Sequence, residues 1–272
     1  MQKSVAGFYV AAIQMISGEH LQANLNQAAM LIRQAVEKGA NLVALPEYFC
    51  LMGAQPQHKL SIQEGFGEGV IQQFLSDQAR QHQIYIVGGS LPLIIPEATR
   101  ISNSLLVYGP NGQCLSRYDK IHLFRYQTAH EQYDESEVIQ AGDVIPTTVH
   151  VGSFKMGLAL CYDLRFPELF RAMGPIDLLV IPSAFTYTTG KAHWEVLLRA
   201  RAIENQCYVL APAQGGRHEN GRTTWGHSLL VSPWGEVIDC LPEGEGVVMG
   251  ELNPQLIMHV REILPALSHR VM

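Results

Sequence analysis

The stretch FKMGLALCYDLRFPEL, residues 154–169, carries an apolar run directly into a more polar segment at Cys161. Residues 154–160 are typical of a buried strand, and the change of composition at Cys161 predicts a turn from strand to helix. Such a turn presents the thiol at the edge of a sheet, where N–H groups at a helix end favour the reactive thiolate. Cys161 is therefore predicted to be a nucleophile.

Two charged residues upstream border apolar segments in a similar way. Glu47 ends the run LVALPE at residues 42–47, and Lys120 lies within RYDKIHLF at residues 117–124. Burial would raise the pKa of Glu47 toward that of a usable base, and a desolvated Lys120 ammonium could stabilise an oxyanion. Taken alone, each residue also fits a solvated surface position. Together with Cys161 they predict cysteine-dependent attack on a carbonyl or nitrile carbon.

The remaining cysteines and histidines indicate no metal site or disulfide framework. The chain has five cysteines, an odd number, and no pair has C-x-x-C spacing. Cys207 and Cys50 fit the small buried hydrophobe that most free cysteines are. His122 fits a core residue or one that supports the site better than a catalytic base, and no H-x-x-x-H spacing suggests zinc. We therefore expect no metal and no cofactor.

Composition favours a cytoplasmic enzyme or binding protein. Of 272 residues, 47% are hydrophobic and 16% are charged, and the net charge is −6. No basic run or basic–aromatic pattern suggests a nucleic-acid partner. No signal-peptide pattern and no apolar stretch of membrane-spanning length occurs. Without a long linker or a repeat, a single domain over residues 1–272 is the simplest interpretation.

Strand-like and helix-like segments alternate along the chain. Helical periodicity follows the strand at residues 8–15, and Gly39 is a plausible helix stop. Turn signals at residues 110–112 and 233–235 predict hairpins. Gly88-Gly89 and Gly215-Gly216 are expected to mark close backbone approaches. The pattern predicts an α/β fold in which two mixed sheets lie between layers of helices. The remaining predicted strands cover residues 42–45, 84–87, 104–108, 147–151, 178–181, 207–211, 228–231, 236–241 and 247–252, and the predicted helices cover 69–81, 194–203 and 254–263.

Three motifs taken together resemble the nitrilase, or carbon–nitrogen hydrolase, superfamily. They are LPE at residues 45–47, YDKIHLF at 118–124 and CYDLRFPEL at 161–169. The similarity extends from the first strand to residues 264–270. The resemblance implies a four-layer α-β-β-α sandwich that often pairs as a dimer, so we expect a homodimer or a higher homo-oligomer. It also implies that Glu47 is the general base, Lys120 the oxyanion-stabilising cation and Cys161 the nucleophile.

The resemblance also implies a second glutamate in the loop after the lysine. Glu135 is the best match, although Glu131 and Glu137 lie close by in the sequence. The pair Arg125-Tyr126 stands where close relatives tend to carry an aspartate, and this departure leaves the local substrate contacts open.

Within the superfamily the chain is most similar to the deaminated glutathione amidases, which act in metabolite repair. Segments 182–186, 190–204 and 226–235 support this branch. The implied activity cleaves a primary carboxamide with release of ammonia through a cysteine thioester. The backbone of Tyr162 would stabilise the oxyanion, while Arg165 and Thr186 would bind a substrate carboxylate. Alternatives are an ω-amidase acting on 2-oxo acid amides, another carbon–nitrogen hydrolase, or a non-catalytic scaffold with the same fold.

Overall fold

The computed structural model of the protein describes residues 7–128 and 132–271. One sheet is built mainly from the N-terminal half of the chain. Its three central strands are parallel, and antiparallel strands extend it on both sides. In spatial order the strands are β17 (Gly246–Leu252), β1 (Phe8–Gln14), β2 (Leu42–Ala44), β3 (Tyr85–Val87), β5 (Ile101–Tyr108) and β4 (Leu91–Ile94), with β6 (Cys114–Asp119) paired to β5.

The second sheet repeats this arrangement with the C-terminal half of the chain. Three parallel strands again occupy its centre, and antiparallel strands flank them. The spatial order is β16 (Val237–Leu241), β15 (Ser228–Val231), β12 (Tyr208–Ala211), β11 (Leu178–Val180), β10 (Phe154–Leu158) and β9 (Thr147–Val151).

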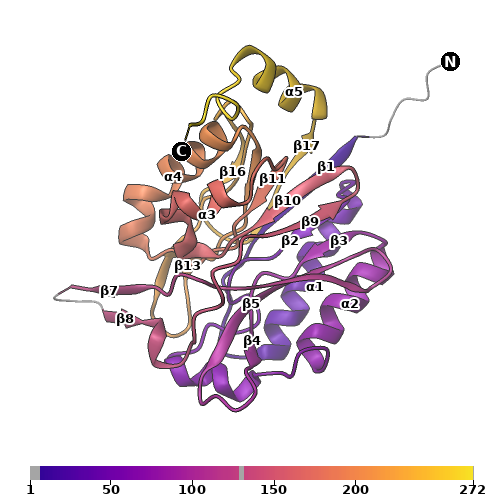
Figure 1. The fold of residues 1–272 in the computed structure, drawn as a ribbon. Coiled ribbons are helices and arrows are strands. Elements are labelled where there is room, and N and C mark those ends of the chain that lie inside the picture. Colours follow the sequence, from indigo (N-terminus) through magenta and orange to yellow (C-terminus); the bar gives the residue numbers. More distant parts are fainter. Residues whose placement is uncertain (1–6, 129–131, 272) are drawn as a thin grey trace.

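Alternate residues of β1 pack into two different cores. Val10 and Ala12 belong to the core between the sheets, whereas Ala11 and Ile13 belong to the core beneath the first pair of helices. Successive side chains of a strand point to opposite faces, so this continuous apolar strand makes the sheet apolar on both faces. The chain therefore has the predicted α-β-β-α layers (Figure 1). The helices are α1 (Leu21–Glu37) and α2 (Val70–His82) on the first sheet, α3 (Pro167–Ala172) and α4 (Tyr187–Asn205) on the second, and α5 (Pro254–Ile263) near the C-terminus.

The predicted strands, helices and both hairpins are confirmed, with shifts of a few residues at their ends. The largest shift concerns α4, which begins at residue 187 rather than 194 because Thr186 caps it and its Oγ1 accepts from the N–H of Thr189. In the part of the chain that the structure covers, no helix has both the length and the apolar character needed to cross a bilayer.

The elements that the sequence did not reveal are short and lie near the loops. Two are hairpins of three-residue strands, which are too short to show a period-two pattern. The missed elements are β4, the hairpins β7 (Arg125–Gln127) with β8 (Gln132–Asp134) and β13 (Gly215–Arg217) with β14 (Thr223–Trp225), and the 3-10 turns η1 (Pro56–Ile62), η2 (Glu135–Glu137) and η3 (Cys161–Arg165).

Gly89 permits the close backbone approach that positions the segment after β2. It has a φ of +55°, and a Cβ atom built there would lie 2.1 Å from the carbonyl oxygen of Pro46. Gly215 is also tightly enclosed, since its Cβ would lie 2.6 Å from Cδ of Gln14. The predicted role of the glycine pairs is therefore confirmed. Because Pro46 directly precedes Glu47, any outward movement of this loop displaces the Glu47 carboxylate.

We predict that Gly89→Ala lowers the free energy of unfolding by about 3 kcal/mol or more, because it combines a left-handed conformation with a backbone clash. Gly39→Ala is the matched control, because Gly39 has a φ of +94° but no atom within 4 Å of its Cβ position. This control should cost only about 1 kcal/mol. Urea unfolding measures both, and equal losses would contradict the role of the close approach.

Candidate active site

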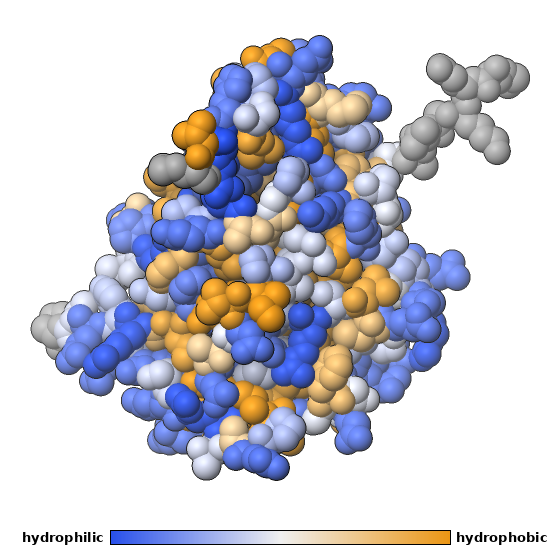
Figure 2. All heavy atoms as spheres, in the orientation of Figure 1, coloured by the Kyte–Doolittle hydropathy of each residue, from blue (hydrophilic) through white to orange (hydrophobic). Residues whose placement is uncertain are grey.

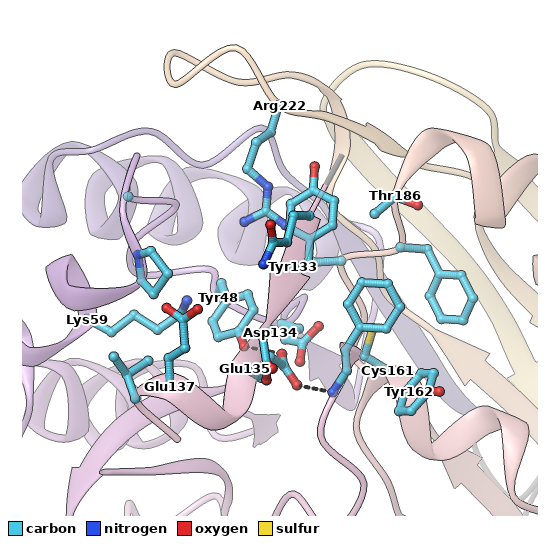
Figure 3. Close-up of a pocket in the computed structure, with 18 of the residues that line it drawn as sticks. Tyr48, Lys59, Tyr133, Asp134, Glu135, Glu137, Cys161, Tyr162, Thr186 and Arg222 are labelled. Carbon is cyan, nitrogen blue, oxygen red and sulfur yellow. Dashed lines mark hydrogen bonds between the residues drawn. The ribbon is translucent and has the colours of Figure 1, made fainter. Parts of the chain in front are cut away.

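Glu47, Lys120, Glu135 and Cys161 meet where strands of both sheets end. Glu47 lies three residues after β2 and Lys120 directly after β6, while Glu135 directly follows β8. Cys161 lies three residues after β10, in the second sheet. Glu47, Glu135 and Cys161 line a pocket of about 440 Å³ (Figure 3). The structure thus brings together four residues that are far apart in the sequence.

Lys120 is not among the residues that line the pocket, but its ammonium lies between two carboxylates that do. Its Nζ is 2.8 Å from Oε1 of Glu47 and 2.9 Å from the carboxylate of Glu135. The Lys120 side chain is 0% exposed, and those of Glu47 and Glu135 are 1% and 13% exposed. A buried cation is stable only with such partners, because burial removes its hydration.

Further donors hold the two carboxylates in place. The Tyr48 hydroxyl donates to Oε1 of Glu135 at 2.6 Å, and the Phe124 N–H donates to Oε2 at 2.7 Å (Figure 3). The Asn103 amide donates to Oε1 of Glu47 at 3.1 Å. Neither Tyr48 nor Asn103 was predicted from the sequence. The only signals in the sequence were that Tyr48 adjoins Glu47 and that Asn103 lies in the polar stretch SNS, residues 102–104, before the apolar part of β5.

The three charges shift one another's pKa values in different directions. Burial raises the pKa of Glu47 more than the nearby Lys120 lowers it, so the net direction is upward, as expected. Burial also acts to raise the pKa of Glu135, but Lys120 and the hydrogen bonds from Phe124 and Tyr48 outweigh it and leave the pKa lowered. Burial acts to lower the pKa of Lys120, but both carboxylates raise it well above its ordinary value. Glu47 is therefore the better proton acceptor of the two carboxylates.

Cys161 occupies a strained turn at the start of η3. Its φ is +44°, a left-handed value that is uncommon outside glycine, and its N–H donates to the Pro182 carbonyl at 3.0 Å. The expectation of a favoured thiolate was wrong. Burial, followed by the negative charge of Glu47, raises the pKa of the thiol well above its ordinary value. Cys161 therefore rests as a thiol and needs a base.

Asp163 anchors the turn that carries Cys161. It is fully buried, and its carboxylate accepts from the Leu160 N–H at 2.9 Å and from the Tyr118 hydroxyl at 2.7 Å. His122 Nδ1 lies 2.7 Å from the same carboxylate, and its ring stacks on Phe166. The interpretation of His122 as a supporting residue is thus confirmed.

The three predicted substrate contacts all line the pocket. The Tyr162 N–H has no acceptor among residues 7–128 and 132–271. The Arg165 guanidinium lies over the rings of Tyr162 and Phe185 and within 3.2 Å of the His193 ring. The Thr186 Oγ1 is buried, accepts from the Thr189 N–H and lies 2.9 Å from the Thr189 hydroxyl oxygen.

Two of the three candidate glutamates in the loop after Lys120 lie within the described residues. Glu135 reaches Lys120, whereas Glu137 is exposed and lines the pocket wall. Glu131 lies outside the described residues. Arg125 and Tyr126 are not among the residues that line the pocket. Across the described part of the chain, no group of three or more His, Cys, Asp or Glu side chains is arranged to hold a metal ion.

We predict that Lys120→Met lowers the free energy of unfolding at pH 7 by about 3–5 kcal/mol, because it leaves two buried carboxylates unpaired. The loss should shrink as pH falls. Without Lys120 both carboxylates gain raised pKa values in the folded state, so protonation stabilises the variant relative to the wild type. Chemical denaturation from pH 8 to pH 5 measures this. Adding Glu47→Gln and Glu135→Gln should recover most of the loss, and no recovery would contradict the charge explanation.

A model of the carbon–nitrogen hydrolase family matches residues 9–262. The chain is 42% identical to a deaminated glutathione amidase of Synechocystis sp. over 97% of this chain and 98% of that protein. It is 36% identical to the omega-amidase NIT2-A of Xenopus laevis, over 98% of this chain and 96% of that protein.

The fold also matches that of solved structures. Nit3 of Saccharomyces cerevisiae, a member of branch 10 of the nitrilase superfamily, superposes with a TM-score of 0.84 at 31% identity. The match covers 95% of this chain and 94% of Nit3. With the family match and the four-layer fold, these similarities lead to one conclusion: the chain belongs to the carbon–nitrogen hydrolase family of the nitrilase superfamily and hydrolyses amide bonds.

Proposed function

We propose that the chain hydrolyses the amide of deaminated glutathione, with Cys161 as nucleophile, Glu47 as general base and Lys120 as oxyanion donor. One observation carries the chemistry. A buried thiol whose pKa is raised shares a pocket with a carboxylate whose pKa is also raised, and a buried ammonium contacts that carboxylate. The deaminated glutathione amidase of Synechocystis sp. supports the choice of substrate.

In the first half of the reaction the amide is exchanged for a thioester. Glu47 accepts the thiol proton as the sulfur of Cys161 attacks the amide carbon. The resulting oxyanion is stabilised by Lys120 and by the Tyr162 N–H, which is free among the described residues. The C–N bond then breaks as Glu47 returns its proton to the departing amine.

In the second half, water releases the acyl group. Glu47 takes a proton from a water molecule, and the hydroxide attacks the thioester carbon. The second tetrahedral intermediate uses the same oxyanion donors. Its collapse breaks the C–S bond, and the proton on Glu47 returns to the sulfur of Cys161. Glu135 takes part in none of these bond-making or proton-transfer steps. It acts as a positioning residue, because it holds the Lys120 ammonium beside Glu47.

The leaving amine differs between the candidate substrates. A primary carboxamide such as 2-oxoglutaramate releases ammonia. Glutathione contains only substituted amides, so its deaminated form releases the dipeptide cysteinylglycine and not the ammonia that the resemblance implied for a primary carboxamide. Both substrates share the same acyl half, which ends in a 2-oxo acid. One active site can therefore perform the same acyl chemistry on both, and discrimination depends on contacts to the leaving group.

Arg165 is our candidate for binding the carboxylate of that shared acyl half. It lies four residues after Cys161, lines the pocket and has no ion pair with an acidic residue within the described ranges. A guanidinium matches the two oxygens of a carboxylate. Thr186 lines the same pocket and is a second candidate contact for this group. The omega-amidase relative supports a second candidate function, hydrolysis of small 2-oxo acid amides, through the same contacts.

We predict that the wild-type protein releases cysteinylglycine from deaminated glutathione with a higher kcat/KM than it releases ammonia from 2-oxoglutaramate. Chromatographic detection of the dipeptide and an ammonia assay measure the two products. The reverse preference would support the ω-amidase function. Cys161→Ala should reduce turnover at least about 10⁴-fold, since the nucleophile is lost. Turnover that survives in a purified Cys161→Ala sample would contradict the mechanism.

We also propose that the chain acts as one catalytic domain, works in the cytoplasm and forms a homodimer. Glu47 and Cys161 come from different sheets, which supports a single unit. The cysteines are all free, which fits a reducing compartment. Hydrophilic side chains cover most of the face in Figure 2, and hydrophobic ones lie among them at the end that carries α5. On α5 the exposed Met258 and Ile263 would be covered in a dimer. Light scattering that finds a monomer at micromolar concentration would contradict this assembly.

A further inference from the structure

Two cationic side chains on one wall of the pocket are not neutralised by the protein. Lys59 comes from η1, and Arg222 directly precedes β14. Both are half-buried and line the pocket. Among residues 7–128 and 132–271, neither side chain has an ion pair with a carboxylate or a side-chain hydrogen bond. Figure 3 shows Lys59 on the side of the pocket away from Cys161 and Tyr162.

Aromatic rings hold both cations without cancelling their charge. The Lys59 ammonium lies 4.4 Å from the centroid of the Tyr48 ring, and the Arg222 guanidinium carbon lies 4.7 Å from that of Tyr133. The Tyr48 hydroxyl is itself fixed by its hydrogen bond to Glu135. These rings leave the N–H groups of both cations available to an incoming anion.

The protonated form of Lys59 is destabilised when the pocket is empty. Burial lowers the pKa of Lys59 to about 8, and the nearby Arg222 contributes in the same direction, although Glu135 opposes it. An anion bound between the two cations would stabilise the protonated form of Lys59. Exposed Glu137 also lines the wall, and its carboxylate is more than 4.0 Å from the nitrogens of both cations.

We propose that Lys59 and Arg222 form a subsite for the terminal carboxylate of the leaving dipeptide, and so select a peptide-like amide over a primary amide. This inference rests on the proposed function. Deaminated glutathione carries two carboxylates, one on each side of the scissile amide. The acyl carboxylate is four bonds from the scissile carbon and is assigned to Arg165, near Cys161. The dipeptide carboxylate is six bonds away and requires a more distant cation.

Binding to catalytically inactive protein tests the subsite. Cys161→Ala protein is titrated calorimetrically with deaminated glutathione and with its C-terminal glycinamide, which lacks only the terminal charge. We expect the acid to bind about tenfold or more tightly than the amide, the range of a charge-assisted hydrogen bond. Adding Lys59→Met or Arg222→Gln should bring this ratio close to one. The matched control Glu137→Gln removes a charge from the same wall and should keep the ratio or increase it.

Equal binding of acid and amide by the Cys161→Ala protein would overturn the subsite, as would a ratio that survives both substitutions. Thermal unfolding shows whether each variant is folded, and Lys59→Arg is the substitute if Lys59→Met is not. Lys59→Arg keeps the charge and should keep the preference for the acid. A variant that loses affinity equally for acid and amide would indicate a packing role and contradict the proposal.

Turnover by the active protein separates this proposal from the general function. Arg222→Gln should lower the ratio of kcat/KM for deaminated glutathione to that for 2-oxoglutaramate at least tenfold, mainly through KM. Arg165→Lys should weaken both substrates, because they share the acyl carboxylate. A wild-type protein that hydrolyses neither compound would refute the proposed function, while the binding ratio would still decide the subsite.

The pH dependence of binding gives a further readout that a structural role would not produce. In the Cys161→Ala protein, affinity for the acid should fall as pH rises through about 8, because free Lys59 loses its proton there. Lys59→Arg should remove this decline, since arginine keeps its charge. An unchanged decline in Lys59→Arg would assign it to another group. The charged or titratable groups that act on Lys59 are Glu47, Tyr48, Lys120, Glu135 and Arg222.

Discussion

The buried ammonium of Lys120 is the interaction on which the site depends. It lies within hydrogen-bond distance of both Glu47 and Glu135. Without its partners, none of the three charged groups would be stable in a buried position, because burial removes its hydration. The cluster carries one positive and two negative charges, so a proton is easily accommodated on one carboxylate. Glu135 is stabilised as an anion by Tyr48 and the Phe124 N–H, and this leaves Glu47 as the proton acceptor.

The fold supplies the geometry that this chemistry needs. Each sheet has parallel strands at its centre, so the loops that follow them emerge at one edge, where the two sheets meet. Those loops hold the strained backbone of Cys161, with a φ of +44°, and of Tyr48, with a φ of +56°. Buried anchors compensate for the strain. Asp163 ties the cysteine turn to Tyr118, and the missing side chain of Gly89 lets the Glu47 loop approach the core.

The pocket has different chemistry on its two sides. Near the thiol, Arg165 and the rings of Tyr162 and Phe185 line the wall. Away from the thiol, Lys59 and Arg222 leave positive charge facing the cavity. In the proposed reaction both candidate substrates undergo the same acyl chemistry, so the choice between them depends on the contacts that these walls make with the two halves of the amide. Short 3-10 turns and hairpin loops, which can vary without disturbing the sheets, contribute much of the second wall.

The sequence by itself determined the layers, the core and the candidate nucleophile, base and cation. Those features depend on local signals, such as the apolar run before Cys161 and the apolar run along residues 8–13, which persist in any packing. It also indicated Glu135, through resemblance alone. Only the tertiary structure decided that Cys161 rests as a protonated thiol and that Tyr48, Asn103, Lys59 and Arg222 surround the site. Desolvation and the field of distant charges depend on how segments remote in sequence pack together, and no local pattern encodes them.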